Sequence, residues 1–248
     1  MKISIITVVY NNEMTIKDAI ESVLSQSYPN IEYIIIDGNS NDNTNQIINN
    51  YKSKLGFYVS EKDSGIYDAM NKGIKAAKGE VIGILNSDDL YENDKVIEMV
   101  MSQFFVDPSL HIVYGDLVYV KRDDVQRVIR NWRSKPYYKH FFEHGNVPPH
   151  PSFFVKRIVY EKAGYFNLNF NLAADYEFML RVAKKFEFKL KYLNKVIVKM
   201  RLGGATNNSF LNIFKQNIEI LNAWKHNDLE PPFYLMPIKI IKRLLQFI

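Results

Sequence analysis

The sequence predicts an α/β fold in which helices cover both faces of a mostly parallel sheet. Apolar, β-rich runs alternate with helical patterns through the first 90 residues. The runs are continuously apolar, which is typical of strands that are buried on both faces. The chain has 248 residues, of which 47% are hydrophobic, and this suffices for a sizeable core without disulfide or metal support.

The elements of the first half have clear boundaries. Asn11-Asn12 ends the first apolar run, and Tyr28-Pro29-Asn30 ends a helix whose apolar residues are spaced i, i+3, i+4, i+7 and i+8. In order, the predicted elements are a strand at 3–9, a helix at 15–25, a strand at 31–36, a helix from 42 or 44 to about 51, a strand at 57–59, a helix at 68–77 and a strand at 81–85.

The second half has a less regular pattern. Its predicted elements are a helix at 94–105, a strand at 111–120, a loop or short strand pair at 121–139, a rigid loop at 148–151, a strand at 152–155, helices at 157–163 and 174–185, one or two strands within 186–198, and a helix at 208–226.

Charge is divided unevenly between the halves. Residues 1–120 carry nine lysines against 17 Asp and Glu, a formal charge of −8, whereas residues 121–248 carry a formal charge of +13. The first half is suited to hold cations and the second to meet an anionic partner; the alternative is that both are simply solvated faces. The chain has no cysteine, which excludes cysteine nucleophiles and Cys-ligated zinc. No signal peptide and no run of about 18 apolar residues is visible, so we expect a cytoplasmic protein.

Carboxylates follow three of the predicted strands directly. Asp37, Asp63 and the pair Asp88-Asp89 occupy these positions. Ligands of open α/β sheets bind at the carboxyl ends of the strands, and carboxylates there can hold a divalent cation. The alternative for Asp88-Asp89 is an N-cap for a helix that begins at Leu90.

Four segments in this order resemble glycosyltransferase family 2, whose members are nucleotide-sugar-dependent enzymes of the GT-A fold. They are Val8–Asn12, Ser22–Thr44, Ala69–Gly79 and Leu85–Asp89. The resemblance covers roughly residues 1–210, and four motifs at compatible spacing are much more specific than one. It implies a Rossmann-like α/β/α sandwich with a nucleotide-sugar half at 1–115 and an acceptor half at 116–226, followed by an amphipathic segment at 227–248.

The resemblance also implies a nucleotide and metal site. Asn86-Ser87-Asp88 stands in the place of the family's Asp-x-Asp motif, with Asn as its first residue, so Asp88 is the expected ligand of Mn²⁺ or Mg²⁺. Asp63 and Asp68 are also explained by turn formation and helix capping. The implied nucleotide-binding residues are Val8, Tyr10, Asp37, Asp63, Asp68, Asn86 and Ser87.

Asp175 is the implied catalytic base. Ala173-Ala174-Asp175 matches the family's Glu-Asp motif with Ala174 in place of Glu. A carboxylate here can take the proton of the acceptor hydroxyl as that oxygen attacks the anomeric carbon. An N-cap for the following helix is compatible with this role.

Three further residues are candidates for contact with the acceptor or the diphosphate. Many relatives carry a histidine after the helix, where this chain has Met200–Thr206, so Arg201 is the candidate cation there. Prolines fix His150 on both sides, and Asp116 ends a strand segment that is common in polysaccharide-assembly members. The alternative for His150 is a loop histidine whose hydrogen bonds are made within the protein, and the alternative for Asp116 is a bulge or turn.

The end of the chain predicts an amphipathic helix at 237–248. Ile238, Ile241, Leu245 and Ile248 share one face, and Lys239, Lys242, Arg243 and Gln246 share the other. Such a helix can lie in a membrane interface, or it can dock on the domain or on a second subunit.

The combined hypothesis is an inverting glycosyltransferase at the cytoplasmic face of the inner membrane. It moves glucose or galactose from a UDP-sugar to a sugar linked through diphosphate to a polyprenyl lipid, with β-1,3-glucosyl transfer to GlcNAc as its most specific form. The alternatives are a sugar nucleotidyltransferase and a catalytically inactive sugar-binding relative. No nucleic-acid partner is expected, and a homo-oligomer is left open.

Overall fold

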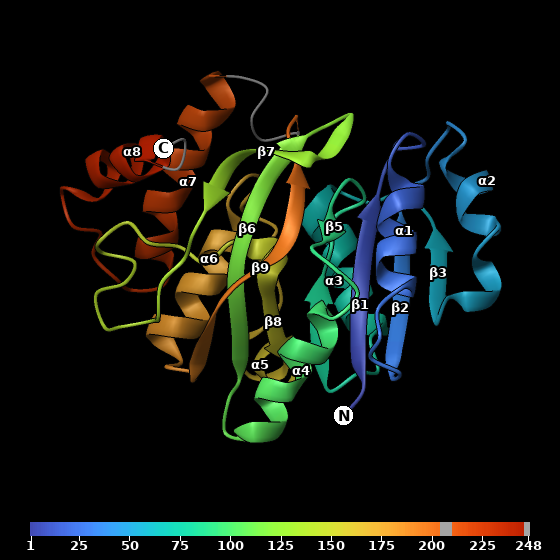
Figure 1. Cartoon of the computed structure of the whole chain (residues 1–248). Helices are drawn as coiled ribbons and strands as arrows, with labels where there is room; N and C mark the ends of the chain where they lie inside the picture. Colours follow the sequence, from blue (N-terminus) through green and yellow to red (C-terminus); the bar gives the residue numbers. More distant parts are fainter. Residues whose placement is uncertain (204–209, 246–248) are drawn as a thin grey trace.

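The computed structural model describes residues 1–203 and 210–245, and these residues form one nine-stranded sheet between two layers of helices (Figure 1). The order of the strands along the sheet is β3-β2-β1-β4-β8-β6-β9-β5, with β7 paired to β6 off this path. In Figure 1 the first strands lie on the right, and the helices α7 and α8 lie on the left. The predicted α/β class is confirmed.

Six of the described strands point in the same direction. β1, β2, β3 and β4 are mutually parallel. β8 is antiparallel to both of its neighbours, β4 and β6, so β6 runs in the same direction as β4, and β9 is parallel to β6. The strands are β1 (Ile3–Val9), β2 (Ile31–Asp37), β3 (Phe57–Ser60), β4 (Val81–Ile84), β5 (Leu90–Tyr91), β6 (Ile112–Lys121), β7 (Asp124–Trp132), β8 (Phe153–Lys156) and β9 (Leu190–Arg201).

The helices divide between the two faces of the sheet because successive strand residues point in opposite directions. In β1, Ile3 and Ile5 belong to the core under α1, α2 and α4, whereas Ile6 and Val8 belong to the core under α3, α5, α6 and α7. The helices are α1 (Ile16–Leu24), α2 (Thr44–Asn49), α3 (Ile66–Ala76), α4 (Val96–Val106), α5 (Arg157–Ala163), α6 (Ala174–Leu180), α7 (Phe210–His226) and α8 (Leu235–Leu245).

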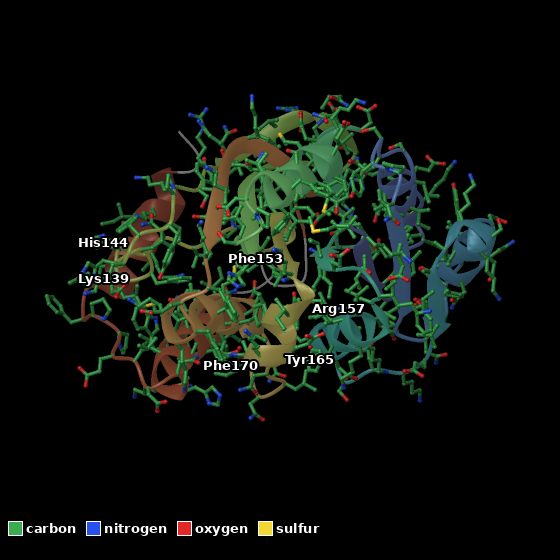
Figure 2. The ribbon with its side chains drawn as sticks, turned by 90° about the horizontal axis from the view of Figure 1, so that it is seen from below. Lys139, His144, Phe153, Arg157, Tyr165 and Phe170 are labelled. Carbon is green, nitrogen blue, oxygen red and sulfur yellow. The ribbon has the colours of Figure 1, made fainter. Side chains whose placement is uncertain are left out.

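The structure makes two loosely predicted stretches of the second half specific and corrects one alternative for the β4 loop. The polar stretch at 121–139, predicted as a loop or short strand pair, contains β7, which forms a hairpin with β6; the region 186–198, predicted to hold one or two strands, contains one strand that extends to Arg201. Leu90–Tyr91 forms β5 on the edge of β9, so the alternative of a helix beginning at Leu90 is wrong. The long connection between β7 and β8 buries Phe141 and Phe142. Figure 2 places Phe153 near the middle of the molecule, with Lys139 and His144 of this connection at one edge.

The C-terminal helix α8 is docked on the domain. Leu235 is fully buried, the Lys239 ammonium lies 4.6 Å from the centroid of the Tyr176 ring, and Lys242 donates a hydrogen bond to Asn146. The opposite side exposes Ile240 and Ile241, each at 56%. The predicted amphipathic helix is present, and its described lysines face the protein. The predicted positions at 246–248 lie outside the described residues, as do residues 204–206 of the Met200–Thr206 segment.

Among the described residues, no helix combines the length and the apolarity that crossing a bilayer requires.

Candidate active site

The loop after β2 is a closed hydrogen-bond network around Asp37. This residue is completely buried. Its carboxylate accepts hydrogen bonds from the Ser40 amide at 3.0 Å and from the hydroxyls of Ser40 and Ser60 at 2.5 Å each. The predicted contact of Asp37 with a base edge stays a prediction, because its carboxylate already has three protein donors.

The neighbouring nucleotide candidates surround this loop. A Cβ placed on Gly38 would lie 2.5 Å from Asp63 Oδ2 and 3.4 Å from the ring of Tyr10, so glycine allows all three residues to approach closely. Tyr10 is 63% exposed and available for stacking, whereas Val8 is buried in the core beneath it.

Asp63 and Asp68 both organise the start of α3. Asp63 accepts a hydrogen bond from the amide of Gly65, and Asp68 accepts one from the amide of Ser64. These contacts agree with the turn and capping alternative. Lys72 lies 3.9 Å from Asp68 and 2.8 Å from Glu61, which adds a cation beside this segment.

The loop after β4 leaves acceptor oxygens without partners. Asn86 Nδ2 donates to Asp89 Oδ2 at 2.9 Å, but Asn86 Oδ1 and Asp89 Oδ1 are buried and have no hydrogen-bond partner within the part of the chain that the structure describes. Ser87 is fixed by Asn12, which donates to its hydroxyl at 2.8 Å. Burial raises the pKa of Asp88. Burial also raises the pKa of Asp89 well above its ordinary value, and the neighbouring carboxylate of Asp88 adds to this rise.

Two arginines flank Asp88. Arg201 is 5% exposed and donates to the carbonyls of Asp88 at 3.1 Å and Arg122 at 3.2 Å, and its third nitrogen pairs with Asp18. Arg201 therefore braces the backbone of the loop, and its predicted contact with diphosphate is not tested by these bonds. Arg122 lies in the exposed turn between β6 and β7, and its positive charge opposes the rise in the pKa of Asp88 that burial causes. Its carbonyl accepts the bond from Arg201, whereas its guanidinium has no hydrogen-bond or ion-pair partner among the described residues. The sequence reasoning did not identify Arg122.

The donor set of this loop fits a divalent cation that shares its ligands with a substrate. Asp88 supplies a partly exposed carboxylate, and the unpartnered oxygens of Asn86 and Asp89 make the loop electron-rich. Within the described residues, no cluster of three or more His, Asp or Glu side chains could hold a metal alone. Mg²⁺ commonly binds through one or two carboxylates plus substrate phosphates, which is the arrangement these residues allow.

Asp175 lies at the second position of α6 and contacts α3. The Tyr67 hydroxyl donates to Asp175 Oδ1 at 3.0 Å. His150, on a 3₁₀ turn (His150–Ser152), is close enough to interact electrostatically with Asp175, although burial lowers its pKa. The N-cap of α6 is Ala173, so the alternative of an N-cap role for Asp175 is wrong.

The segment before Asp175 is held by a residue of α7. Glu219 accepts hydrogen bonds from the amides of Asn171 at 3.1 Å, Leu172 at 2.8 Å and Ala173 at 2.9 Å. This remote carboxylate therefore satisfies the amide of the N-cap residue Ala173 and the two amides before it, and it fixes the segment that leads into α6. No sequence signal identified Glu219.

Asp116 lies apart from these groups in the bonding network. It is 5% exposed and accepts hydrogen bonds from the Ser134 amide at 2.7 Å and the Tyr192 hydroxyl at 2.9 Å. The register of β6 against β9 shifts on both sides of Asp116. These register shifts agree with the alternative of a bulge at Asp116. The contact of Asp116 with an acceptor stays a prediction.

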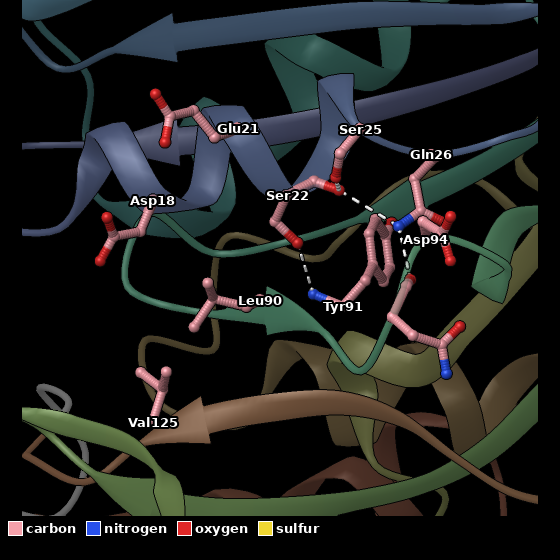
Figure 3. A pocket seen from close by; sticks show the side chains of 10 residues that line it. Asp18, Glu21, Ser22, Ser25, Gln26, Leu90, Tyr91, Asp94 and Val125 are labelled. Atoms are coloured by element: carbon pink, nitrogen blue, oxygen red, sulfur yellow. Dashed lines mark hydrogen bonds between the residues drawn. The ribbon is translucent and has the colours of Figure 1, made fainter.

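An open hollow lies beside α1 and β5 (Figure 3). Ser22 of α1 accepts a hydrogen bond from the Tyr91 amide at 2.8 Å, and Gln26 binds the Asn93 carbonyl at 2.7 Å. None of the predicted site residues lines it. Its rim includes Asp18, the partner of Arg201, so it adjoins the back of the β4 loop.

Comparison with known proteins identifies the family. Residues 4–163 match the family model described as Glycosyl transferase family 2. The chain belongs to glycosyltransferase family 2. Within this family it is similar to an uncharacterized glycosyltransferase of Haemophilus influenzae, with 30% identity over 227 residues that cover 90% of this chain and 87% of the relative.

Two solved structures share the fold of this family 2 glycosyltransferase. S. aureus TarS 1–349 in complex with UDP-GlcNAc superimposes with a TM-score of 0.70 at 19% identity, over 96% of this chain and 70% of TarS 1–349. Mannosyltransferase PcManGT from Pyrobaculum calidifontis in complex with GDP-Man and Mn²⁺ gives 0.64 at 17% identity, over 98% and 74% of the two chains. The sheet is therefore GT-A-like, as predicted.

Proposed function

We propose that this nucleotide-sugar-dependent glycosyltransferase moves a hexose, glucose or galactose, from a UDP-sugar to a hydroxyl of a polyprenyl-diphosphate-linked sugar, with inversion. In its most specific form the reaction is β-1,3-glucosyl transfer to GlcNAc in the assembly of a bacterial surface polysaccharide. The observation that supports the chemistry most directly is Asp175, a carboxylate at the start of α6 that meets Tyr67 from the predicted nucleotide half.

The proposed reaction assigns each of these residues a step. The acceptor O–H bond breaks and its proton passes to Asp175, while the acceptor oxygen forms a bond to the anomeric carbon. The bond between that carbon and the diphosphate oxygen breaks on the opposite face, and UDP leaves. Mn²⁺ or Mg²⁺, held by Asp88, would supply positive charge to the diphosphate. Arg122 is a second source of positive charge there, because its guanidinium already acts on Asp88.

The likeness to TarS, whose structure holds UDP-GlcNAc, supports a UDP-sugar donor. The structure of PcManGT with GDP-Man and Mn²⁺ supports a metal cofactor, and it is the reason to include a GDP-sugar among the donors to be tested. The division into a nucleotide-sugar half at 1–115 and an acceptor half at 116–226 remains part of the proposal.

A donor and acceptor screen tests the proposal. Purified protein is given UDP-glucose, UDP-galactose, UDP-GlcNAc or GDP-mannose with a short polyprenyl-diphosphate-GlcNAc acceptor, and nucleotide release and the product linkage are measured. We expect UDP release that depends on the acceptor, a β-linked product, and a loss of about 10²–10⁴-fold in Asp175→Asn. An α-linked product, or equal activity in Asp175→Asn, would contradict the proposed mechanism.

A peripheral position at the inner membrane is the second part of the proposal. Because Lys239 and Lys242 of α8 face the protein, the surface available to lipid is the pair Ile240 and Ile241. Exposed apolar side chains on a basic half are suited to the interface of an anionic leaflet.

Replacing both isoleucines tests this position. We expect Ile240→Ser with Ile241→Ser to reduce sedimentation with vesicles of phosphatidylglycerol and phosphatidylethanolamine several-fold. The matched control, Phe105→Ser with Val106→Ser, removes exposed apolar surface at the end of α4 and should have no effect. Equal sedimentation of all three proteins would leave α8 as a docked helix only.

A further inference from the structure

The hydrogen bond between Tyr67 and Asp175 joins two segments that are 108 residues apart in the chain. Tyr67 belongs to the first turn of α3, directly after the segment that Asp63 and Asp68 organise. Asp175 belongs to the first turn of α6. The contact therefore connects the edge of the predicted nucleotide site with the predicted base.

The Tyr67 hydroxyl is a hydrogen-bond donor at any physiological pH. Burial raises its pKa well above the ordinary value, and the carboxylates of Asp175 and Glu219 act in the same direction. A protonated phenol beside an ionised carboxylate donates its proton to the shared bond. Asp175 Oδ1 is thus the acceptor in this contact.

Neighbouring contacts fix the position of the Tyr67 ring. Its centroid lies 5.6 Å from that of Phe166. One turn further along α3, Asn71 exchanges two hydrogen bonds with the backbone of Phe166, at 2.9 Å and 3.0 Å. Helix α3 is therefore tied to the segment that leads into α6, which keeps the backbone of Tyr67 close to Asp175, and the contact with the Phe166 ring restricts the Tyr67 side chain.

We propose that Tyr67 is a positioning residue for the base: its hydroxyl occupies Oδ1 and fixes the orientation of the carboxylate, so that Oδ2 receives the proton of the acceptor. This inference rests on the proposed function for the identity of the base. The proton passes from the acceptor oxygen to Oδ2 while Tyr67 keeps its own, so the step needs no additional donor or acceptor. A hydrogen bond to the charged form of a carboxyl group favours that form.

The titratable groups around Asp175 come from three elements. Tyr67 faces it from α3, His150 acts on it from the 3₁₀ turn, and Glu219 of α7 acts on Tyr67. Burial lowers the pKa of His150, so its ring is neutral at pH 7 and above. Among the described residues, Tyr67 is therefore the side chain that hydrogen-bonds to Asp175 directly.

The test removes the Tyr67 hydroxyl and follows the Asp175 carboxyl directly. The chain is labelled with ¹³C at aspartate carboxyl carbons, and the Asp175 signal is identified by its loss in Asp175→Asn. In Tyr67→Phe we expect the pKa of Asp175 to rise by about one unit, with the acid limb of the kcat profile moving in the same direction. The KM for the donor should stay within about twofold, because Tyr67 acts through the base.

Tyr160→Phe is the matched control. Tyr160 also packs near Phe166, at a centroid distance of 6.4 Å, and its hydroxyl has no hydrogen bond in the described residues. We expect this variant to leave the Asp175 titration unchanged. A shift of the same size in both variants would assign the effect to general repacking and overturn the proposal.

A second substitution keeps the proposal testable if Tyr67→Phe unfolds. Incorporation of 3,5-difluorotyrosine at position 67 makes the phenol a stronger donor, so the Asp175 pKa should fall. An Asp175 titration that neither variant moves would overturn the role of Tyr67. Absence of turnover in the unmodified chain with every donor would instead contradict the proposed function, while the carboxyl titration would still report on Tyr67.

Discussion

The loops after β2 and β4 both contain a fully buried aspartate and differ in how their polar groups are satisfied. In the first, Asp37 has three protein donors. In the second, one oxygen of Asp89 and one oxygen of Asn86 have no hydrogen-bond partner among the described residues. Both loops follow parallel strands at the same edge of the sheet.

The two loops therefore differ in whether described protein groups satisfy their buried carboxylates. Hydrogen bonds from protein donors compensate a buried carboxylate for the loss of its hydration, and a buried carboxylate without them is destabilised in its charged form. The raised pKa values of Asp88 and Asp89 are consistent with this destabilisation. A cation at the second loop would offset it, and the first loop needs no such partner.

The largest effect should come from removing the charge or the metal at the second loop. Asp88→Asn, or chelation with EDTA, should reduce kcat/KM by about 10³-fold, since a bound cation supplies several kcal/mol of charge stabilisation. Mn²⁺ should restore the chelated protein. Calorimetry of Mn²⁺ with UDP should give no binding in Asp88→Asn and normal binding in Asp123→Asn, whose carboxylate pairs with Lys121. Activity that EDTA leaves unchanged would remove the metal from this loop.

Asp37→Asn should act on stability instead. In this variant an NH₂ group replaces one carboxylate oxygen, and it cannot accept the hydrogen bonds that the Ser40 and Ser60 groups donate. The free energy of unfolding should therefore fall by about 1–3 kcal/mol. Urea denaturation measures the change, with the exposed Asp94→Asn as control. If the stability of Asp37→Asn equals that of the control, the first loop is not a self-sufficient network and the comparison fails.

Asp89→Asn should have the smallest effect, and the opposite sign. The folded pKa of Asp89 is raised, so the metal-free folded chain binds this proton more tightly than the unfolded chain does. Its stability therefore falls as pH rises above the unfolded pKa of about 3.9. The variant lacks this loss, so its melting temperature in EDTA should exceed that of the unmodified chain at pH 8, by a few degrees. The advantage should vanish near pH 4; a constant difference would point to packing.

The first half of the fold could be predicted closely because its signals are local. β1 occupies Ile3–Val9, as expected from an apolar run with polar residues after it. The second half depends on pairings between distant segments. Leu90 and Tyr91, for example, form a strand by pairing with β9, which lies about 100 residues further along the chain. No pattern in the sequence around Leu90 predicts this pairing.

The site divides in the same way. Asp37, Asp88 and Asp175 could be found from motifs because each stands at a fixed place in a short segment. Tyr67, Arg122 and Glu219 could not, because their roles arise from contacts across the chain. Glu219, for example, meets the segment before Asp175 from 46 to 48 residues away.

The bonds from Glu219 to the start of α6 have a consequence for the order in which the enzyme matures. A chain leaving the ribosome presents Asp175 well before Glu219 exists, so the segment that carries it lacks its clamp until α7 has been made. The strands β1, β2, β3 and β4 can pair earlier, because they are complete by residue 84. A nascent chain that stalls before α7 would therefore leave the segment that carries the proposed base without the bonds that hold it.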